Sequence, residues 1–252
     1  MSKIRIAAPA LALTSLHTGI MASAMAVMYF IFSTSYGEPN MTVLNLPFLL
    51  LLAFLLTLGA KRYFNWDTDF FPPMRKIHLL WLVPIMLAIL QIYVIFVLNA
   101  DPSNHPLFAT AALLLATMLI GYTEELTFRG ILMTGLLRAG LKPLTVIILS
   151  GLAFGLFHFV NLLGNTTFDA ALGQVISTTV TGLCYGAVFW HLKSLWPLML
   201  VHWQWDAALM LANRDPNVMA AIETIDPILA GYVMPLKLVI FLVLMVNILR
   251  KG

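Results

Sequence analysis

Long apolar runs, broken by short polar connections, dominate the pattern along the chain. About eight of these runs approach the roughly 20 residues that a helix needs to cross the hydrocarbon core of a bilayer. The runs are continuous and do not alternate between polar and apolar residues, which is typical of helices and not of a transmembrane β-barrel. We therefore predict an all-α bundle of about eight transmembrane helices, over residues 10–33, 43–60, 77–99, 107–135, 146–164, 171–191, 195–212 and 228–249.

The basic residues support this number of spans because they gather in alternate connections. They flank both termini and occupy the connections that contain Lys61, Arg75, Arg138 and Lys193, whereas the opposite connections hold only Arg214. The positive-inside rule then predicts that both termini are cytoplasmic. With no linker or repeat to divide it, the chain is expected to form a single transmembrane domain over 1–252. We expect a multi-pass protein of a bacterial plasma (inner) membrane.

Composition excludes several other classes of protein. Hydrophobic residues make up 61% of the chain and charged residues only 10%, too few to coat a soluble domain, of which about a quarter is charged on average. Disorder would need low hydrophobicity and high net charge. The formal charge is only +3 and the basic residues are dispersed, which argues against nucleic acid as a partner. The single cysteine excludes a disulfide framework.

Charged residues inside the fourth run form the first candidate site, because an ionisable group in a span is costly and suggests function. Glu125 and Arg129 are spaced i,i+4, so they are expected to pair on one face of the helix. Glu124 points about 100° away, toward a different partner and without a local cation. A desolvated carboxylate without a partner makes a good general base. The alternative is a purely structural ion network.

Histidines in the fifth and seventh runs form two further clusters. His158 follows Phe154 by four residues, with Asn161 one turn later, and is either a general base or metal ligand or an interior histidine bonded to a nearby carbonyl. His202 and Asp206 share a helical face, and Asp206 either takes part in the chemistry or only orients the histidine. Lipid would not tolerate these groups, so we expect them to line a cavity inside the protein.

Two glycines lie in the same run as His158. Gly151 and Gly155 form a small-xxx-small pattern, which indicates a close contact with another helix. At the 1.5 Å rise per residue of an α-helix, the depths of Glu124 and His202 in their spans are about equal, and both residues lie in the cytoplasmic half. This position favours access from the cytoplasm or from the lipid.

The three clusters together resemble the motifs of the CPBP family of CAAX proteases and bacteriocin-processing enzymes, also called the Abi family, which includes the CAAX prenyl protease Rce. The family pattern is E-E-x-x-x-R, F-x-x-x-H and H-x-x-x-N or D on successive transmembrane helices. It is matched at 124–129, 154–158 and 202–206. The resemblance covers the second half of the chain, with a motif core at about 107–212, and the first three spans support it only as hydrophobic segments.

The resemblance implies a glutamic intramembrane protease. Glu124, with His158, would activate a water, while His202 and Asp206 would stabilise the oxyanion of the tetrahedral intermediate. The catalytic set implied is therefore Glu124, His158, His202 and Asp206. The supporting residues implied are Glu125 and Arg129, which would hold the fourth helix in register, together with Phe154 and Asn161.

Metal dependence stays open in the sequence. Glu124, His158 and His202 would be an adequate zinc set on chemical grounds. The family resemblance favours a metal-free mechanism, and we expect no cofactor.

Asp206 stands where many members of the family, including the CAAX proteases, have asparagine. Asparagine donates through its amide, whereas an ionised aspartate only accepts, so Asp206 must be protonated to serve an oxyanion. Otherwise it orients His202, which then donates alone. Lys237, in the last run, would enforce this second arrangement by pairing with Asp206.

Three functions compete. The leading hypothesis is an intramembrane endopeptidase, with the lipid bilayer and a membrane-associated protein or peptide substrate as its partners. The second is a non-proteolytic scaffold or bacteriocin-immunity-type protein of the same family. The third is a transporter that uses Glu124, His158 and His202 as a proton relay, but the sequence lacks the paired repeats that are common in transporters.

Overall fold

The computed structural model describes residues 2–38 and 40–250, with the side chains of 225–231 left aside, and over these residues it is all-α without a strand. This confirms the predicted fold class. The α-helices are α1 (Lys3–Phe30), α2 (Met41–Leu44), α3 (Leu46–Tyr63), α4 (Val83–Asn99), α5 (Leu107–Glu125), α6 (Met133–Arg138), α7 (Pro143–Phe157), α8 (Phe168–Leu192), α9 (Trp196–Ala212) and α10 (Pro216–Leu249). The π and 3₁₀ segments are η1 (Trp66–Phe70), η2 (Lys76–Leu82), η3 (Pro102–Asn104), η4 (Leu126–Leu132) and η5 (His158–Gly164).

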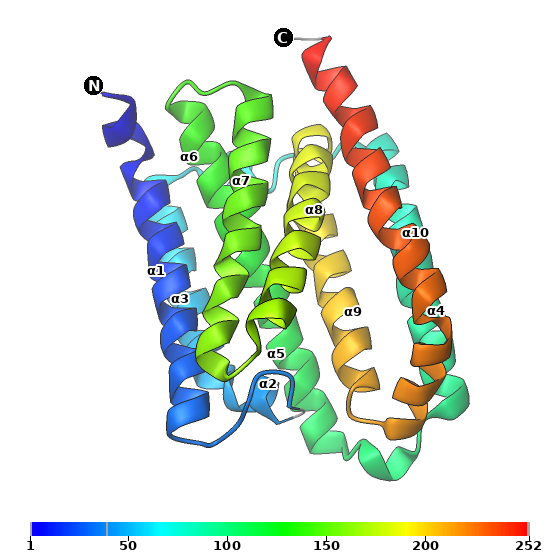
Figure 1. Ribbon diagram of the computed structural model, residues 1–252. Coiled ribbons are helices and arrows are strands. Elements are labelled where there is room, and N and C mark those ends of the chain that lie inside the picture. The colour runs from blue at the N-terminus through cyan, green and yellow to red at the C-terminus, as the bar shows by residue number, and fades with distance from the viewer. Residues whose placement is uncertain (1, 39, 251–252) are drawn as a thin grey trace.

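The long helices form one bundle with both termini at the same end, and the short helix α2 lies at the other end (Figure 1). Within the described residues, seven helices are long and apolar enough to cross a membrane. The predicted span at 195–212 forms α9, which has 17 residues and is shorter than these seven. The chain is therefore an integral, multi-pass membrane protein. The side of the membrane that holds the termini stays a prediction.

Two of the predicted spans begin at least seven residues later than their helices do. α1 starts at Lys3, where the side chain of Ser2 accepts a hydrogen bond from the backbone amide of Arg5. α10 starts at Pro216, where Asp215 caps the helix and proline occupies the first turn, a position that needs no backbone N–H. Polar capping chemistry, which a hydropathy pattern does not contain, sets both starts.

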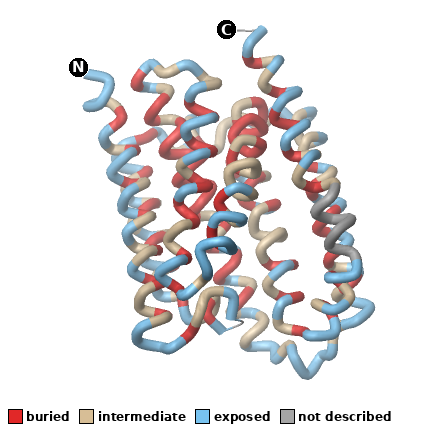
Figure 2. The backbone as a smooth tube through the Cα atoms, in the orientation of Figure 1, coloured by how far each residue is buried: buried red, intermediate tan, exposed pale blue. Residues whose placement is uncertain are grey.

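Two helices change their winding at the sequence motifs. The long helix over residues 107–138 is α-helical to Glu125, turns into the π-helical segment η4, and becomes α-helical again as α6. The helix that begins at Pro143 tightens into the 3₁₀ segment η5 at His158. π segments inside α-helices are rare and frequently lie at functional sites. Buried residues concentrate in the helices at the middle of the bundle (Figure 2).

Glycines allow the central helices to approach closely. A Cβ atom added to Gly151 would lie 2.9 Å from the backbone nitrogen of Leu183, and one added to Gly182 would lie 2.8 Å from the Cα atom of Gly151. Gly155 likewise faces Thr179 on α8. The contact predicted from the small-residue pattern is therefore confirmed, between α7 and α8.

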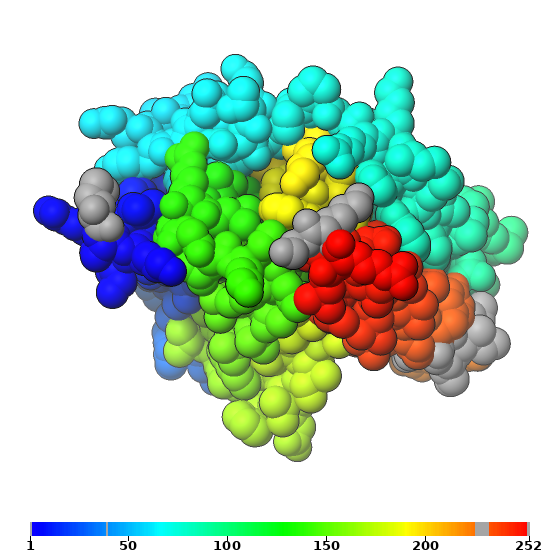
Figure 3. Space-filling model, turned by 90° about the horizontal axis from the view of Figure 1, so that it is seen from above, coloured from blue at the N-terminus to red at the C-terminus, as the bar shows by residue number. Residues whose placement is uncertain are grey.

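The end of the bundle that carries the termini is seen face-on in Figure 3. The hairpin of α6 and α7 (green) lies between the N-terminal helix (blue) and α10 (red). On the inner side of this end, every residue of η4 is buried. The bundle is therefore filled by side chains between the motif residues of α5 and the terminal end.

Candidate active site

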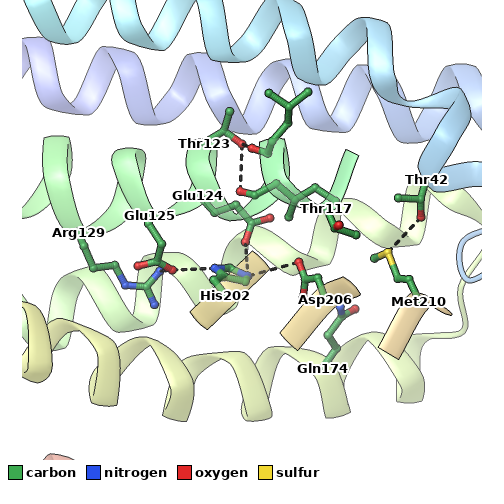
Figure 4. A network of polar contacts seen from close by, with 12 residues as sticks. Thr42, Thr117, Thr123, Glu124, Glu125, Arg129, Gln174, His202, Asp206 and Met210 are labelled. Atoms are coloured by element: carbon green, nitrogen blue, oxygen red, sulfur yellow. Dashed lines mark hydrogen bonds and ion pairs between the residues drawn. The ribbon is translucent and has the colours of Figure 1, made fainter. Parts of the chain in front are cut away.

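Helices α5 and α9 bring the first and third motifs together. Nδ1 of His202 lies 2.8 Å from Oε1 of Glu125, and Nε2 of the same ring lies 3.6 Å from Oε2 of Glu124. His202 is thus placed between the two adjacent carboxylates (Figure 4). The helices can approach this closely because Gly121 faces the backbone of Trp203, where a Cβ atom would come within 2.9 Å of the Trp203 nitrogen.

Glu125 and Arg129 form the predicted i,i+4 ion pair, with 3.0 Å between Oε1 and Nη1. Both side chains are fully buried. The expectation that Glu124 and Glu125 face different partners is wrong, because both reach His202. The two nitrogens of an imidazole point in different directions, so one ring can bridge two carboxylates that lie about 100° apart on a helix.

The contacts of His202 define a proton arrangement. Glu125 is paired with a guanidinium, so its carboxylate accepts, and Nδ1 of His202 donates to it. Nε2 faces Oε2 of Glu124 and Oδ2 of Asp206, each 3.6 Å away. These distances exceed a direct hydrogen bond. The three groups thus gather around Nε2 on the wall of a cavity, which is described below. Glu125, and not Asp206, orients the ring.

Phe154 connects the second motif to the other two. Its ring lies under the guanidinium of Arg129, 4.1 Å from the ring centroid, and makes edge contacts with His158 and His202. Among the described residues, Nε and Nη2 of Arg129 have no hydrogen-bond partner, so this cation–π contact is an important part of what holds the buried charge. The supporting role expected for Phe154 therefore has a physical basis.

His158 lies on the wall of the same cavity as Glu124 but is not bonded to it. Nδ1 of His158 lies 2.9 Å from the carbonyl oxygen of Phe154 and donates to it. This leaves Nε2 as a proton acceptor. Over the described part of the chain, no hydrogen bond or ion pair joins His158 to Glu124. Of the two interpretations of His158, the bond to a nearby carbonyl is therefore present, and it leaves one ring nitrogen for chemistry.

A cavity of about 510 Å³ adjoins these groups, and Glu124, His158, His202 and Asp206 all line it. From them it extends toward α2, where Thr42 contributes to its wall (Figure 4). This is the end of the bundle opposite to the termini. The depth of Glu124 and His202 favours access from the cytoplasm or from the lipid, and the side of the membrane on which this end lies stays a prediction. The buried side chains of η4 fill the space on the other side.

Polar residues that the sequence motifs do not include form part of the cavity wall. Asn161 donates to Gln174, and Gln174 donates to the hydroxyl of Tyr36. Burial raises the pKa of Tyr36 to about 12, and the carboxyl groups of Asp206 and Glu124 act in the same direction. The phenol is therefore protonated at neutral pH.

The sequence does contain a signal for this wall. Polar residues recur on α8 at helical spacing and all line the cavity: Gln174, Ser177, Thr178 and Thr181. Tyr36, by contrast, is a single aromatic residue in a connection, and no pattern in the sequence marks it.

The sequence hypothesis required Lys237 to pair with Asp206, and the structure does not contain this pair among the described residues. Nζ of Lys237 lies 2.9 Å from the hydroxyl oxygen of Thr181 and 4.6 Å from the ring centroid of Trp205. No ion pair links Lys237 to a carboxylate within the described residues.

The zinc set considered from the sequence is not assembled in this structure. Among the described residues, no group of three or more histidine, cysteine, aspartate or glutamate side chains is arranged to hold a metal ion. We therefore derive no chemical step from a metal.

Comparison with known proteins gives one match. Residues 106–208 match the family described as type II CAAX prenyl endopeptidase Rce1-like. No curated protein and no solved structure matches the chain. The matched residues contain all three motifs and end within α9, so α10 lies outside the match.

Proposed function

Because residues 106–208 match the family of Rce1-like type II CAAX prenyl endopeptidases, we propose that the chain is an intramembrane endopeptidase that cleaves a membrane-associated protein or peptide. The observation that supports this most directly is the grouping of Glu124 and Asp206 around Nε2 of His202. Carboxyl oxygens of Glu124 and Asp206 lie 3.6 Å from that nitrogen, on the wall of the cavity. The adjoining cavity of about 510 Å³ has room for a water and a scissile carbonyl beside these groups.

Glu124 is the general base in this proposal. Its carboxylate takes a proton from a water, and the water oxygen attacks the carbonyl carbon of the scissile peptide bond. His158 offers Nε2 as a second acceptor for that water, since its Nδ1 is committed to the carbonyl of Phe154.

His202 and Asp206 stabilise the oxyanion. With Nδ1 donating to Glu125, a ring that carries both protons also donates Nε2–H to the oxyanion. Asp206, when protonated, supplies an O–H donor. The tetrahedral intermediate then collapses, and Glu124 passes its proton to the leaving amine. Removing one such donor typically lowers kcat about 10²- to 10³-fold.

The proposed setting is the plasma membrane of a bacterium, with hydrolysis that needs no metal. Adding 1,10-phenanthroline to the purified protein should leave its rate of hydrolysis unchanged. A loss of activity that zinc restores would contradict this part of the proposal.

The test compares protein termini in membranes from cells that carry the wild-type chain, Glu124→Gln or Thr117→Val at matched expression. Thr117 is a suitable control, because it is buried on the same helix and lies outside the cavity. Among the described residues, its hydroxyl bonds only to the backbone of its own helix. New termini that are present with the wild type and Thr117→Val, but absent with Glu124→Gln, would identify the substrate and the bond cleaved.

The scaffold alternative makes the opposite prediction. If the protein acts as a scaffold, cells that carry Glu124→Gln keep the wild-type phenotype, because glutamine has the same shape as glutamate. If the three termini profiles are identical while deletion of the protein still has a phenotype, the proposed proteolysis is wrong.

A further inference from the structure

Lys237 is a buried cation on the wall of the cavity. It lies on α10, outside the residues that match the family. Its side chain is only 5% exposed, and it lines the cavity together with Glu124, His202 and Asp206. A lysine at this depth in a span is costly, and such residues mark substrate or ion pathways more often than packing.

The protein satisfies this ammonium group only in part. A lysine has three N–H donors, and the hydroxyl of Thr181 takes one of them. The face of the Trp205 ring provides a second favourable contact. Neither partner carries a negative charge, and in the described part of the chain no carboxylate forms an ion pair with Lys237.

The position of Lys237 relates it to the chemistry. Trp205, over which the ammonium lies, directly precedes Asp206 in α9. Lys237 on α10 and Asp206 on α9 line the same cavity, so the cation faces the space in which the oxyanion is proposed to form. The cavity volume of about 510 Å³ is that of a pocket for a drug-sized ligand, so a group bound at Lys237 belongs to the same short stretch of substrate as the scissile bond.

We propose that Lys237 forms a subsite that binds a carboxylate group of the substrate, a few residues from the bond that is cleaved. This inference rests on the proposed function and adds a substrate class to it. A substrate carboxylate supplies the negative charge and the hydrogen-bond acceptors that Lys237 lacks. An ammonium–carboxylate contact in a desolvated site is a strong, charge-assisted hydrogen bond.

The carboxylate has two sources in a peptide, the chain terminus and an acidic side chain. Three randomised pools of apolar, N-terminally lipidated peptides separate them. One pool ends in a free carboxylate, one ends in an amide, and one ends in an amide but contains a glutamate among its last three residues. The protein is Glu124→Gln in nanodiscs, so that peptides are bound but not hydrolysed, and the captured peptides are counted by mass spectrometry.

The subsite predicts that one carboxylate-bearing pool is enriched about tenfold or more over the amide pool. Adding Lys237→Met should abolish the enrichment, and Lys237→Arg should keep it. Lys193→Met is the matched control, since Lys193 also lies over a tryptophan ring, that of Trp190, but does not line the cavity. It should leave the enrichment unchanged.

Equal capture of the three pools would overturn the inference, as would an enrichment that survives Lys237→Met. The folded state of each variant is checked by its melting temperature, and Lys237→Met removes a buried charge without removing length. Because capture needs no hydrolysis, this result is separate from the comparison of termini. A carboxylate preference without proteolysis would support the subsite and contradict the proposed protease. Proteolysis without a carboxylate preference would support the protease and contradict the subsite.

Discussion

Oε1 of Glu125 lies 2.8 Å from Nδ1 of His202, a residue 77 positions further along the chain, and the same oxygen lies 3.0 Å from Nη1 of Arg129. One carboxylate oxygen therefore joins the ion pair inside η4 and α5 to the histidine of α9. The supporting pair and the proposed oxyanion donor form one network, which links stability to activity.

Glu125→Gln should destabilise the protein, because it leaves the guanidinium of Arg129 buried without a counter-charge. Breaking a buried pair in this way costs about 3–5 kcal/mol, which would appear as a lower melting temperature in detergent. The double variant Glu125→Gln/Arg129→Met should recover most of that stability. It should not recover hydrolysis, because His202 still lacks its anionic partner. If the losses of stability from the two substitutions simply add in the double variant, Glu125 and Arg129 are not coupled in this way.

Asp206→Asn should retain activity within a few-fold of the wild type, whereas Asp206→Ala should lose about 10²-fold or more. Asparagine donates at every pH, but aspartate donates only while it is protonated. The wild type should therefore lose activity as pH rises through the titration of Asp206, and Asp206→Asn should lack that decline. Identical pH–rate profiles for the two proteins would show that Asp206 is not an oxyanion donor.

Gly121→Ala should reduce activity by about 10²-fold, since a misplacement of about 1 Å has effects of that size. The added methyl group would lie 2.9 Å from the backbone nitrogen of Trp203 and 3.1 Å from the carbonyl oxygen of Met199. Backbone atoms cannot rotate away, so α9 must shift and carry His202 with it. Gly173→Ala, where a Cβ atom meets nothing within 4 Å, is the control and should retain full activity.

Asp215 should make stability depend on pH in the acid range. Burial acts to raise its pKa, but hydrogen bonds from the backbone amides of Asp101, Asn217 and Val218 outweigh burial and hold the pKa below its ordinary value. A carboxyl with a lowered folded-state pKa stabilises the fold above its ordinary pKa, near 3.9, and this contribution is lost as pH falls through the folded value.

The melting temperature of the wild type should therefore exceed that of Asp215→Asn at neutral pH, and the difference should shrink below about pH 4. Both proteins are measured in the same detergent across that range. A difference that stays constant as the pH falls would show that the charge of Asp215 does not stabilise the start of α10.

Much of the fold could be predicted from the sequence because it depends on local pattern. Apolar runs of membrane-spanning length predicted the helices, and the i,i+4 spacing predicted the pair of Glu125 and Arg129. The π-helical winding of η4 was not predictable, since nothing in its sequence distinguishes it from an α-helix. The two cap-defined helix starts, at Lys3 and Pro216, were missed because capping is independent of hydropathy.

The site was predicted as a set of residues but not as a set of contacts. Motif spacing named Glu124, His158, His202 and Asp206, and all four line one cavity. Which nitrogen of His202 faces which carboxylate depends on how α5 crosses α9, a long-range relation that Gly121 permits. The place of Tyr36 depends on the connection after α1, where its backbone amide bonds to the carbonyl of Gly164. Contacts between residues that lie this far apart in the chain leave no local pattern in the sequence.

The extension of the cavity toward α2 has a consequence for the order of events in the cell. Basic connections predict that the termini stay in the cytoplasm, and α2 lies at the opposite end of the bundle. A substrate segment would then reach Glu124 only after translocation across, or insertion into, the bilayer. Cleavage would then follow translocation or insertion, and the machinery that carries out that step, rather than the ribosome, would set its timing.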